Sequence, residues 1–141
     1  MPLYRVSTEN LATIVNPMSG EMWKCEPIDV EEVKTAMSSG CTAEDSWNAQ
    51  KDAIPNELHR DFHVRRIAAL ASKAISNENH PVVIAIAPDR VWIYDGNHRV
   101  AAAIVRGDPT LDVIIAPYDA SAISSHFPTA ELLDEQLASE K

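Results

Sequence analysis

Apolar residues along the chain gather in short runs that have the length of single strands. A continuous apolar run at 82–87 and a β-branched, aromatic run at 91–94 flank a turn at 88–90, which predicts a β-hairpin. Residues 111–117 form another apolar run typical of a buried strand, and residues 3–6 are compatible with a short first strand. The sequence therefore predicts a small sheet.

Other segments have the 3.6-residue apolar period of amphipathic helices. In the first, Val30, Val33 and Met37 share one face, Asp29 can cap the start and Gly40 can close the end. The predicted helices are residues 28–40, residues 56–77 with Asn56 as cap and Asn77 at the end, residues 97–106 followed by Gly107, and residues 129–140.

Two stretches, residues 9–27 and 41–55, show no such period and are predicted to be irregular, the second of them a mobile loop. Strands and helices together predict an α+β fold, with a small mixed sheet flanked by helices. A length of 141 residues suits a single domain over residues 1–141.

The charge of the chain is unevenly distributed. Its net charge of −9 argues against a protein that mainly grips duplex DNA, because phosphate neutralisation dominates such binding. Residues 60–106 nevertheless hold six of the seven arginines, with seven basic and four acidic residues. A basic region on an acidic body suits a small anionic ligand, such as a nucleotide. The alternative is that the acidic residues merely lie on helix faces that are exposed to solvent.

Segments that would target the chain to a membrane are not visible in the sequence. No apolar run approaches the roughly 18 residues of a membrane span, and the first ten residues lack the apolar core of a secretory signal. Cys25 and Cys41 are too few for a disulfide framework and fit no common zinc spacing. We expect a cytoplasmic protein with free thiols and no membrane partner.

Candidate chemistry concentrates where the second hairpin strand runs into a helix, at Asp95-Gly96-Asn97-His98-Arg99, which we call the DGNHR segment. Gly96 allows a sharp turn at positive φ and leaves room for a close ligand. Asn97 is a strong N-cap type, and the free N–H groups of a helix N-terminus attract anions. Arg99 adds a planar fork suited to phosphate. The segment therefore predicts a phosphate-binding corner.

The remaining two side chains are the candidates for catalysis. His98 can donate to a phosphate or act as acid or base near neutral pH. Asp95 can hold Mg²⁺, take a proton or brace the loop. The alternative is that Asp95 and Asn97 only cap the turn, while His98 and Arg99 are ordinary surface residues.

The long predicted helix carries a polar stripe, because His59, His63 and Arg66 recur at i, i+4 and i+7. We expect this helix to pack near the DGNHR segment, so that His63 and Arg66 complete the phosphate site. In the alternative, the arginines of this helix are exposed and pair with Asp61 or Glu57. The spacing of His59 and His63 also fits a metal, but no third ligand is identified and no metal site is predicted.

The stretch "IYDGNHRVAAAIVRGDPTLDVIIAP" resembles the signature segment of the ParB/sulfiredoxin-like superfamily: a strand, a D-G-x-H-R type motif, an alanine-rich helix, a glycine and a further strand. The preceding "DFHVRRIAAL" and "HPVVIAIAPDRVWI" are similar to plasmid- and phage-associated ParB-like proteins. The resemblance covers residues 61–117 and leaves residues 1–55 and the C-terminal segment unaccounted for.

The resemblance implies a nucleotide phosphate at the DGNHR segment, since ParB members bind CTP, sulfiredoxins use ATP and a serine kinase of this fold uses ADP, with Mg²⁺ as a candidate cofactor. It implies phosphate hydrolysis or transfer, or nuclease activity. Asn97 stands where a sulfiredoxin has its catalytic cysteine, so that reaction is not expected. The DNA-binding and dimerisation regions of a partition protein are not expected in the short segment after the last predicted strand. The alternative function is a non-enzymatic adaptor or mobile-element accessory protein with an acidic partner surface.

Overall fold

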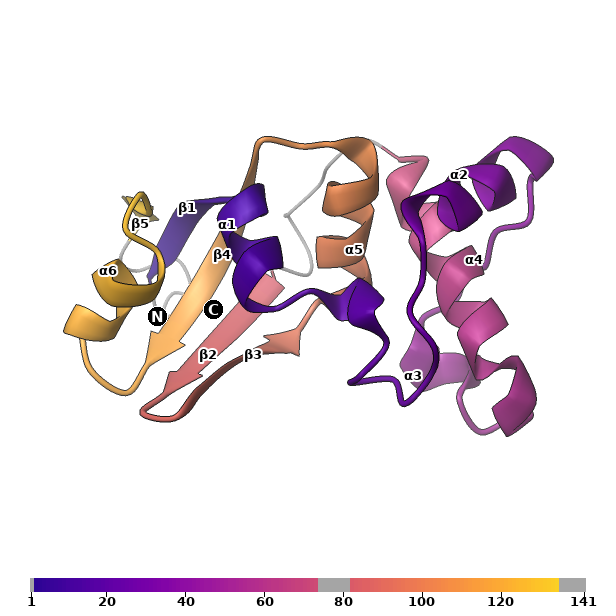
Figure 1. Cartoon of the computed structure of the whole chain (residues 1–141), viewed down its shortest axis with the longest axis horizontal. Coiled ribbons are helices and arrows are strands. Elements are labelled where there is room, and N and C mark those ends of the chain that lie inside the picture. Colours follow the sequence, from indigo (N-terminus) through magenta and orange to yellow (C-terminus); the bar gives the residue numbers. More distant parts are fainter. Residues whose placement is uncertain (1, 74–81, 135–141) are drawn as a thin grey trace.

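The sheet of the computed structural model, which describes residues 2–73 and 82–134, is mixed (Figure 1). Its strand order is β3-β2-β4-β1-β5; β2 and β4 run parallel, and every other neighbouring pair is antiparallel. The strands are β1 (Leu3–Ser7), β2 (Val82–Ala87), β3 (Arg90–Asp95), β4 (Thr110–Pro117) and β5 (Glu131–Asp134). The expected α+β class, the hairpin and the strand at 111–117 are thereby confirmed.

The helices form two groups beside this sheet. Figure 1 shows α5 between the sheet on one side and α2 with α4 on the other. The α-helices are α1 (Thr8–Ile14), α2 (Val30–Ser39), α3 (Trp47–Gln50), α4 (His59–Ala71), α5 (Asn97–Arg106) and α6 (Ser121–His126), with 3₁₀ turns η1 (Pro17–Ser19) and η2 (Asn56–Leu58). Within the described ranges, no helix is long and apolar enough to cross a bilayer.

The alanine-rich sequence of α5 follows from its central place. On one side Val100 and Ala103 join the core that α5 forms with the sheet. On the other side Ala101 and Ala102 join a second core with α2 and α4, which includes Ile67. A helix buried on both sides needs small side chains if its neighbours are to pack closely. This packing brings α4 to the N-terminus of α5.

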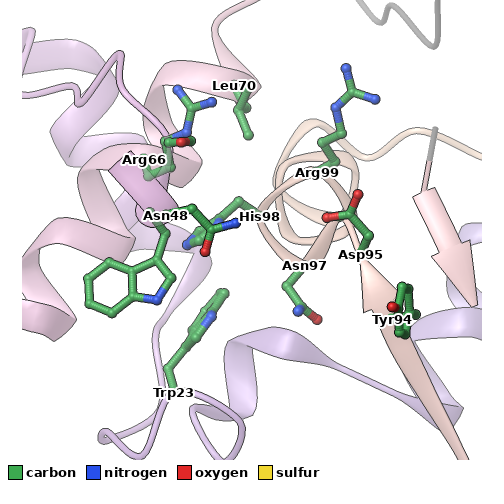
Figure 2. Close-up of a pocket in the computed structure, with 12 residues that line it drawn as sticks. Trp23, Asn48, Arg66, Leu70, Tyr94, Asp95, Asn97, His98 and Arg99 are labelled. Carbon is green, nitrogen blue, oxygen red and sulfur yellow. The ribbon is translucent and has the colours of Figure 1, made fainter. Parts of the chain in front are cut away.

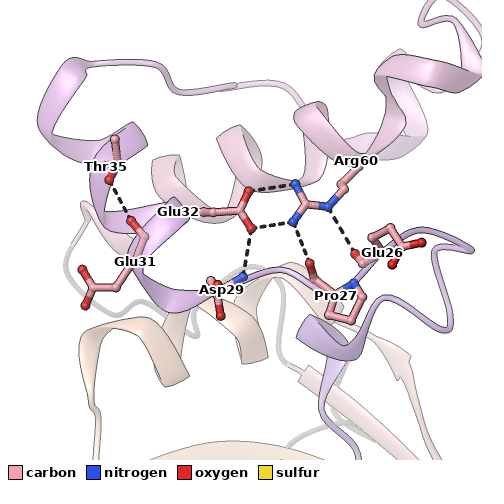
Figure 3. Close-up of polar contacts among 7 residues, drawn as sticks. All are labelled: Glu26, Pro27, Asp29, Glu31, Glu32, Thr35 and Arg60. Atoms are coloured by element: carbon pink, nitrogen blue, oxygen red, sulfur yellow. Dashed lines mark hydrogen bonds and ion pairs between the residues drawn. The ribbon is translucent and has the colours of Figure 1, made fainter.

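An arginine of α4 joins the N-terminal part of the chain to this framework. Arg60 binds the Glu32 carboxylate with two nitrogens, and its Nη2 also donates to the Pro27 carbonyl at 2.6 Å (Figure 3). A Glu32 oxygen also accepts from the backbone N–H of Asp29 at 3.2 Å, at the predicted start of α2. Gly40 ends α2 in the left-handed region, as predicted. Arg60 thus fixes the segment before α2 against α4.

Two stretches predicted to be irregular contain helices. Residues 9–27 include most of α1, which Ser7 caps by accepting from the Asn10 N–H at 3.1 Å, and residues 41–55 include α3. Both helices are short, with seven and four residues, so neither shows a clear amphipathic period. Local caps, and the packing of Leu11 in the core, stabilise these two helices, which the periodicity of the sequence does not predict.

One predicted helix boundary and one predicted helix are wrong. Asn56 begins the 3₁₀ turn η2 and does not cap α4, which follows from His59 to Ala71, and the expected end at Asn77 lies outside the described residues. The predicted helix at 129–140 is replaced, where the structure describes it, by β5 pairing with β1. Pairing with an otherwise open strand edge overrides the local helical pattern there.

Candidate functional site

A cavity of about 540 Å³ opens where the N-terminus of α5 meets α4 and the segment around α3 (Figure 2). Its volume falls within the roughly 300–1,000 Å³ of small-molecule pockets. All five residues of the DGNHR segment line it, together with Arg66 of α4. The other lining residues are Trp23, Ser46, Trp47, Asn48, Leu70 and Tyr94. Segments distant in sequence therefore meet at the predicted corner.

Gly96 turns the chain from β3 into α5 in the left-handed region, at φ 103°, as predicted. Access for a ligand, which was one expected reason for a glycine at this position, is not the whole reason. A Cβ at this position would lie 2.9 Å from Cγ2 and 3.1 Å from Cα of Val82. Glycine is therefore required by the close approach of β2 as well as by the backbone conformation.

The prediction that Asn97 caps α5 is wrong, because Gly96 occupies the N-cap position and makes no side-chain capping bond. Asn97 is the first helical residue. Its Oδ1 is buried and has no hydrogen-bond partner in the described part of the chain. The first N–H groups of a helix have no acceptor within it. Among the described residues, no side chain therefore caps the start of the ten-residue α5, which lies at the cavity.

Two arginines line the same cavity from different helices. The Nη1 atom of Arg99 is buried and unpartnered among the described residues. Burial lowers the pKa of Arg99, the positive charge of Arg66 lowers it further, and Asp95 acts in the opposite direction. A guanidinium nitrogen that is buried without a hydrogen-bond partner is costly. An anion in the cavity would offset that cost.

The bonds of Arg66 connect the cavity to the segment that carries α3. Its Nη1 donates to the carbonyls of Ala43 at 3.2 Å and Glu44 at 2.7 Å. Burial is the main cause that lowers its pKa. The ion pair considered for the arginines of α4 is made by Arg65, whose Nε lies 2.9 Å from Asp61. In the ranges described, no carboxylate lies within ion-pair distance of either Arg66 or Arg99.

His63 and His98 form a hydrogen-bonded pair where α4 packs against α5. The expected packing of α4 near the DGNHR segment is thereby confirmed. Nδ1 of His63 and Nε2 of His98 are 2.8 Å apart. Burial lowers the pKa of His63 to about 4, with a smaller contribution from the charge of His59. Burial also lowers the pKa of His98 to about 3, and the charges of His63 and Arg66 add to the effect. Both rings of the pair are therefore neutral near pH 7, one donating and the other accepting.

His59 does not join this pair. Its Nε2 lies 2.9 Å from the carbonyl oxygen of Ile54, and its ring makes an edge contact with Trp47. Within the residues that the structure describes, no three His, Cys, Asp or Glu side chains are close enough together to hold a metal ion. His59 and His63 thus have separate hydrogen-bond partners, although they share a stripe on one helix.

Four lining residues, Trp23, Ser46, Trp47 and Asn48, were missed by sequence reasoning because they lie in stretches without a period. Trp23 stacks on both imidazoles of the histidine pair, Trp47 packs against His63, and Asn48 follows Trp47 at the cavity wall. Large aromatic side chains in an otherwise polar, aperiodic segment were the available signal, because such side chains seldom remain unpacked.

Comparison of the chain with models of protein families, with curated proteins and with solved structures gave no match. The function of the site is therefore inferred from the chemistry of the residues that line it. It combines an uncapped helix N-terminus, two arginines without an ion-pair partner among the described residues, and aromatic and amide walls. Such an arrangement can bind an anion that carries a planar or polar group.

Proposed function

We propose that the protein binds a nucleotide in this cavity, with its phosphate at the N-terminus of α5 and between Arg66 and Arg99. The observation that carries the proposal is the buried Nη1 of Arg99, which has no partner in the described ranges and belongs to a residue that lines the cavity. A charge-assisted bond to phosphate would satisfy it. The DGNHR segment's resemblance to the ParB/sulfiredoxin-like superfamily, whose members hold nucleotide phosphates at this segment, supports the same ligand.

The roles within the DGNHR segment follow from its geometry. Backbone N–H groups of Asn97 and its successors and the fork of Arg99 bind phosphate, and Gly96 forms the turn. Asp95, at the end of β3, is the candidate for a bound Mg²⁺ or for proton transfer. His98 is neutral and buried, and a pKa of about 3 makes it a weak base at neutral pH. Binding is thus better supported at His98 than acid–base catalysis.

Thermal shift against CTP, ATP, ADP and GTP, with and without Mg²⁺, tests the proposal. We expect at least one nucleotide to raise the unfolding temperature of the wild type, because a ligand that binds only the folded state stabilises it. Arg99→Ala should remove the shift, whereas Arg90→Ala, on β3 outside the cavity lining, should keep it. No shift with any nucleotide, or an equal shift in Arg99→Ala, would contradict the proposal.

Turnover is measured in the same samples as released phosphate. Hydrolysis that is lost in Asp95→Asn would make the protein a nucleotide hydrolase. Binding without turnover would make it a nucleotide-controlled adaptor. Cleavage of plasmid DNA that requires Asp95, without nucleotide binding, would replace the proposal by nuclease activity.

A further inference from the structure

Trp23 stands in a segment that is held firmly before α2. The Trp23 N–H donates to the Gly20 carbonyl at 3.2 Å, and the Ile28 N–H closes the segment by donating to the Met18 carbonyl at 2.8 Å. Arg60 adds its bond to the Pro27 carbonyl (Figure 3). The indole is therefore placed by backbone bonds and by α4. It lines the cavity from a part of the chain that the family resemblance does not reach.

One face of this indole is covered by the histidine pair. Trp23 is stacked with His63 at a centroid distance of 4.3 Å and 12° between planes, and with His98 at 4.7 Å and 16°. The two imidazole centroids are only 5.0 Å apart. Rings on opposite faces at those stacking distances would be nearly twice as far from each other, so both lie on the same face.

The opposite face of Trp23 is left uncovered by these rings, and Trp23 lines the cavity. In Figure 2 Trp23 lies at one end of the lining residues, and Arg66 and Arg99 lie at the other. Asn48 lies between these ends and presents an amide that can both donate and accept. A ligand with phosphate at the arginines and a planar ring at Trp23 would span the cavity.

We infer that Trp23 is the stacking surface for the base of the bound nucleotide, backed on its other face by the hydrogen-bonded His63–His98 pair. The inference rests on the proposed function and assigns the base contact to a residue outside the DGNHR segment. Stacking on an indole is open to every base, because every base has a π-face. Trp23 therefore sets a preference for nucleotides over phosphorylated sugars.

Calorimetric titration of the full chain with AMP, CMP and ribose 5-phosphate, which all carry one phosphate, tests this inference. We expect the better nucleotide to bind the wild type at least about ten-fold more tightly than ribose 5-phosphate; this corresponds to about 1.4 kcal/mol, within the range of a single base–aromatic stack. Trp23→Leu should lose this preference and keep its affinity for ribose 5-phosphate. Trp23→Phe should retain most of the preference, and Trp92→Leu, outside the cavity lining, should retain all of it.

A second measurement does not depend on the folding of Trp23→Leu. In Trp92→Phe, nucleotide should quench the emission and ribose 5-phosphate should not, and adding Trp23→Phe should remove most of the quenching. Equal affinities for nucleotide and ribose 5-phosphate, or nucleotide binding without quenching, would overturn the inference and leave the proposed phosphate site standing. If no phosphate compound binds at all, the proposed function fails, and this inference fails with it.

Discussion

Nδ1 of His63 and Nε2 of His98 lie 2.8 Å apart, so that a single N–H···N bond joins the middle of α4 to the first turn of α5. Such a bond exists only while at least one of the two facing nitrogens is unprotonated. Burial opposes charging of both rings. The contact that forms the back of the cavity therefore depends on pH.

Stability should fall as the pH drops below about 6.5. The folded-state pKa values of His63 and His98, about 4 and about 3, lie below the ordinary 6.5, so the unfolded chain binds protons first. The stabilisation is complete above pH 6.5 and is lost as the pH falls toward these values. We expect a loss on the order of 3 kcal/mol for each ring between pH 7 and pH 4, since each pKa unit is about 1.4 kcal/mol.

Urea unfolding at a series of pH values measures this loss. His98→Gln should reduce the slope of stability against pH between 4 and 6.5, because one of the two titrating rings is gone. His126→Gln, on α6, serves as the control and should keep the wild-type slope. An unchanged slope in His98→Gln would show that the pair does not govern the pH dependence.

Arg99 should lower the stability of the unliganded protein and raise its affinity for nucleotide. Replacing it by methionine removes a guanidinium whose buried Nη1 has no partner among the described residues. We expect Arg99→Met to raise the free energy of unfolding of the unliganded protein by about 1 kcal/mol, because the cost of the buried charge disappears. Nucleotide affinity should meanwhile fall at least about ten-fold. Loss of stability in the unliganded variant would indicate that Arg99 has a structural partner instead.

Gly96 should tolerate no side chain. An alanine there combines a φ of 103° with a Cβ 2.9 Å from Val82, so we expect Gly96→Ala to lower the free energy of unfolding by about 2–3 kcal/mol. Gly107 is the matched control, since its φ is 75° and a Cβ placed there would meet nothing within 4 Å among the described residues. Gly107→Ala should cost only the strain of the left-handed backbone, about 1 kcal/mol. Equal losses in urea unfolding would disprove the role of Val82.

Arg60 should contribute more to stability than Arg65 on the same helix, because Arg60 makes more hydrogen bonds. Arg60→Ala removes bonds to Glu32 and to the carbonyls of Glu26 and Pro27, and we expect unfolding to require about 1–2 kcal/mol less. Arg65→Ala breaks an exposed pair with Asp61 on the same helix, which should change stability by less than about 0.5 kcal/mol. Similar losses for both variants, measured by denaturant unfolding, would contradict a role of Arg60 in holding the segment before α2.

The corner between β3 and α5 was predictable because its signals are local. A β-branched strand, a glycine able to adopt positive φ and an alanine-rich helix follow one another directly, and the structure forms each of them. The approach of α4 to this segment was also expected: Arg66 lines the cavity as predicted, whereas His63 bonds to His98 and is not among the lining residues. Asn97 was misjudged, because residue preference favours it as a cap over the glycine that in fact occupies that position.

The aromatic side of the cavity could not be predicted. Trp23 lies in an irregular segment and Trp47 begins the four-residue helix α3. The positions of both depend on long-range contacts, such as the bond from Arg60 to Pro27 and those from Arg66 to Ala43 and Glu44. Periodicity reports only on regular elements. The same limit explains β5, where pairing with β1 decides the conformation of a segment whose sequence favours a helix.

We propose that the cavity binds nucleotide phosphate through Arg99 and Arg66. Isothermal titration of the wild type with ATP and CTP, beside Arg99→Met, Arg66→Met and the control Arg90→Met, tests it most directly. We expect one nucleotide to bind per chain in the wild type and in Arg90→Met, and the affinity of each cavity variant for nucleotide to be at least about ten-fold lower. Wild-type protein that binds neither nucleotide, or cavity variants that bind as tightly as the control, would contradict it.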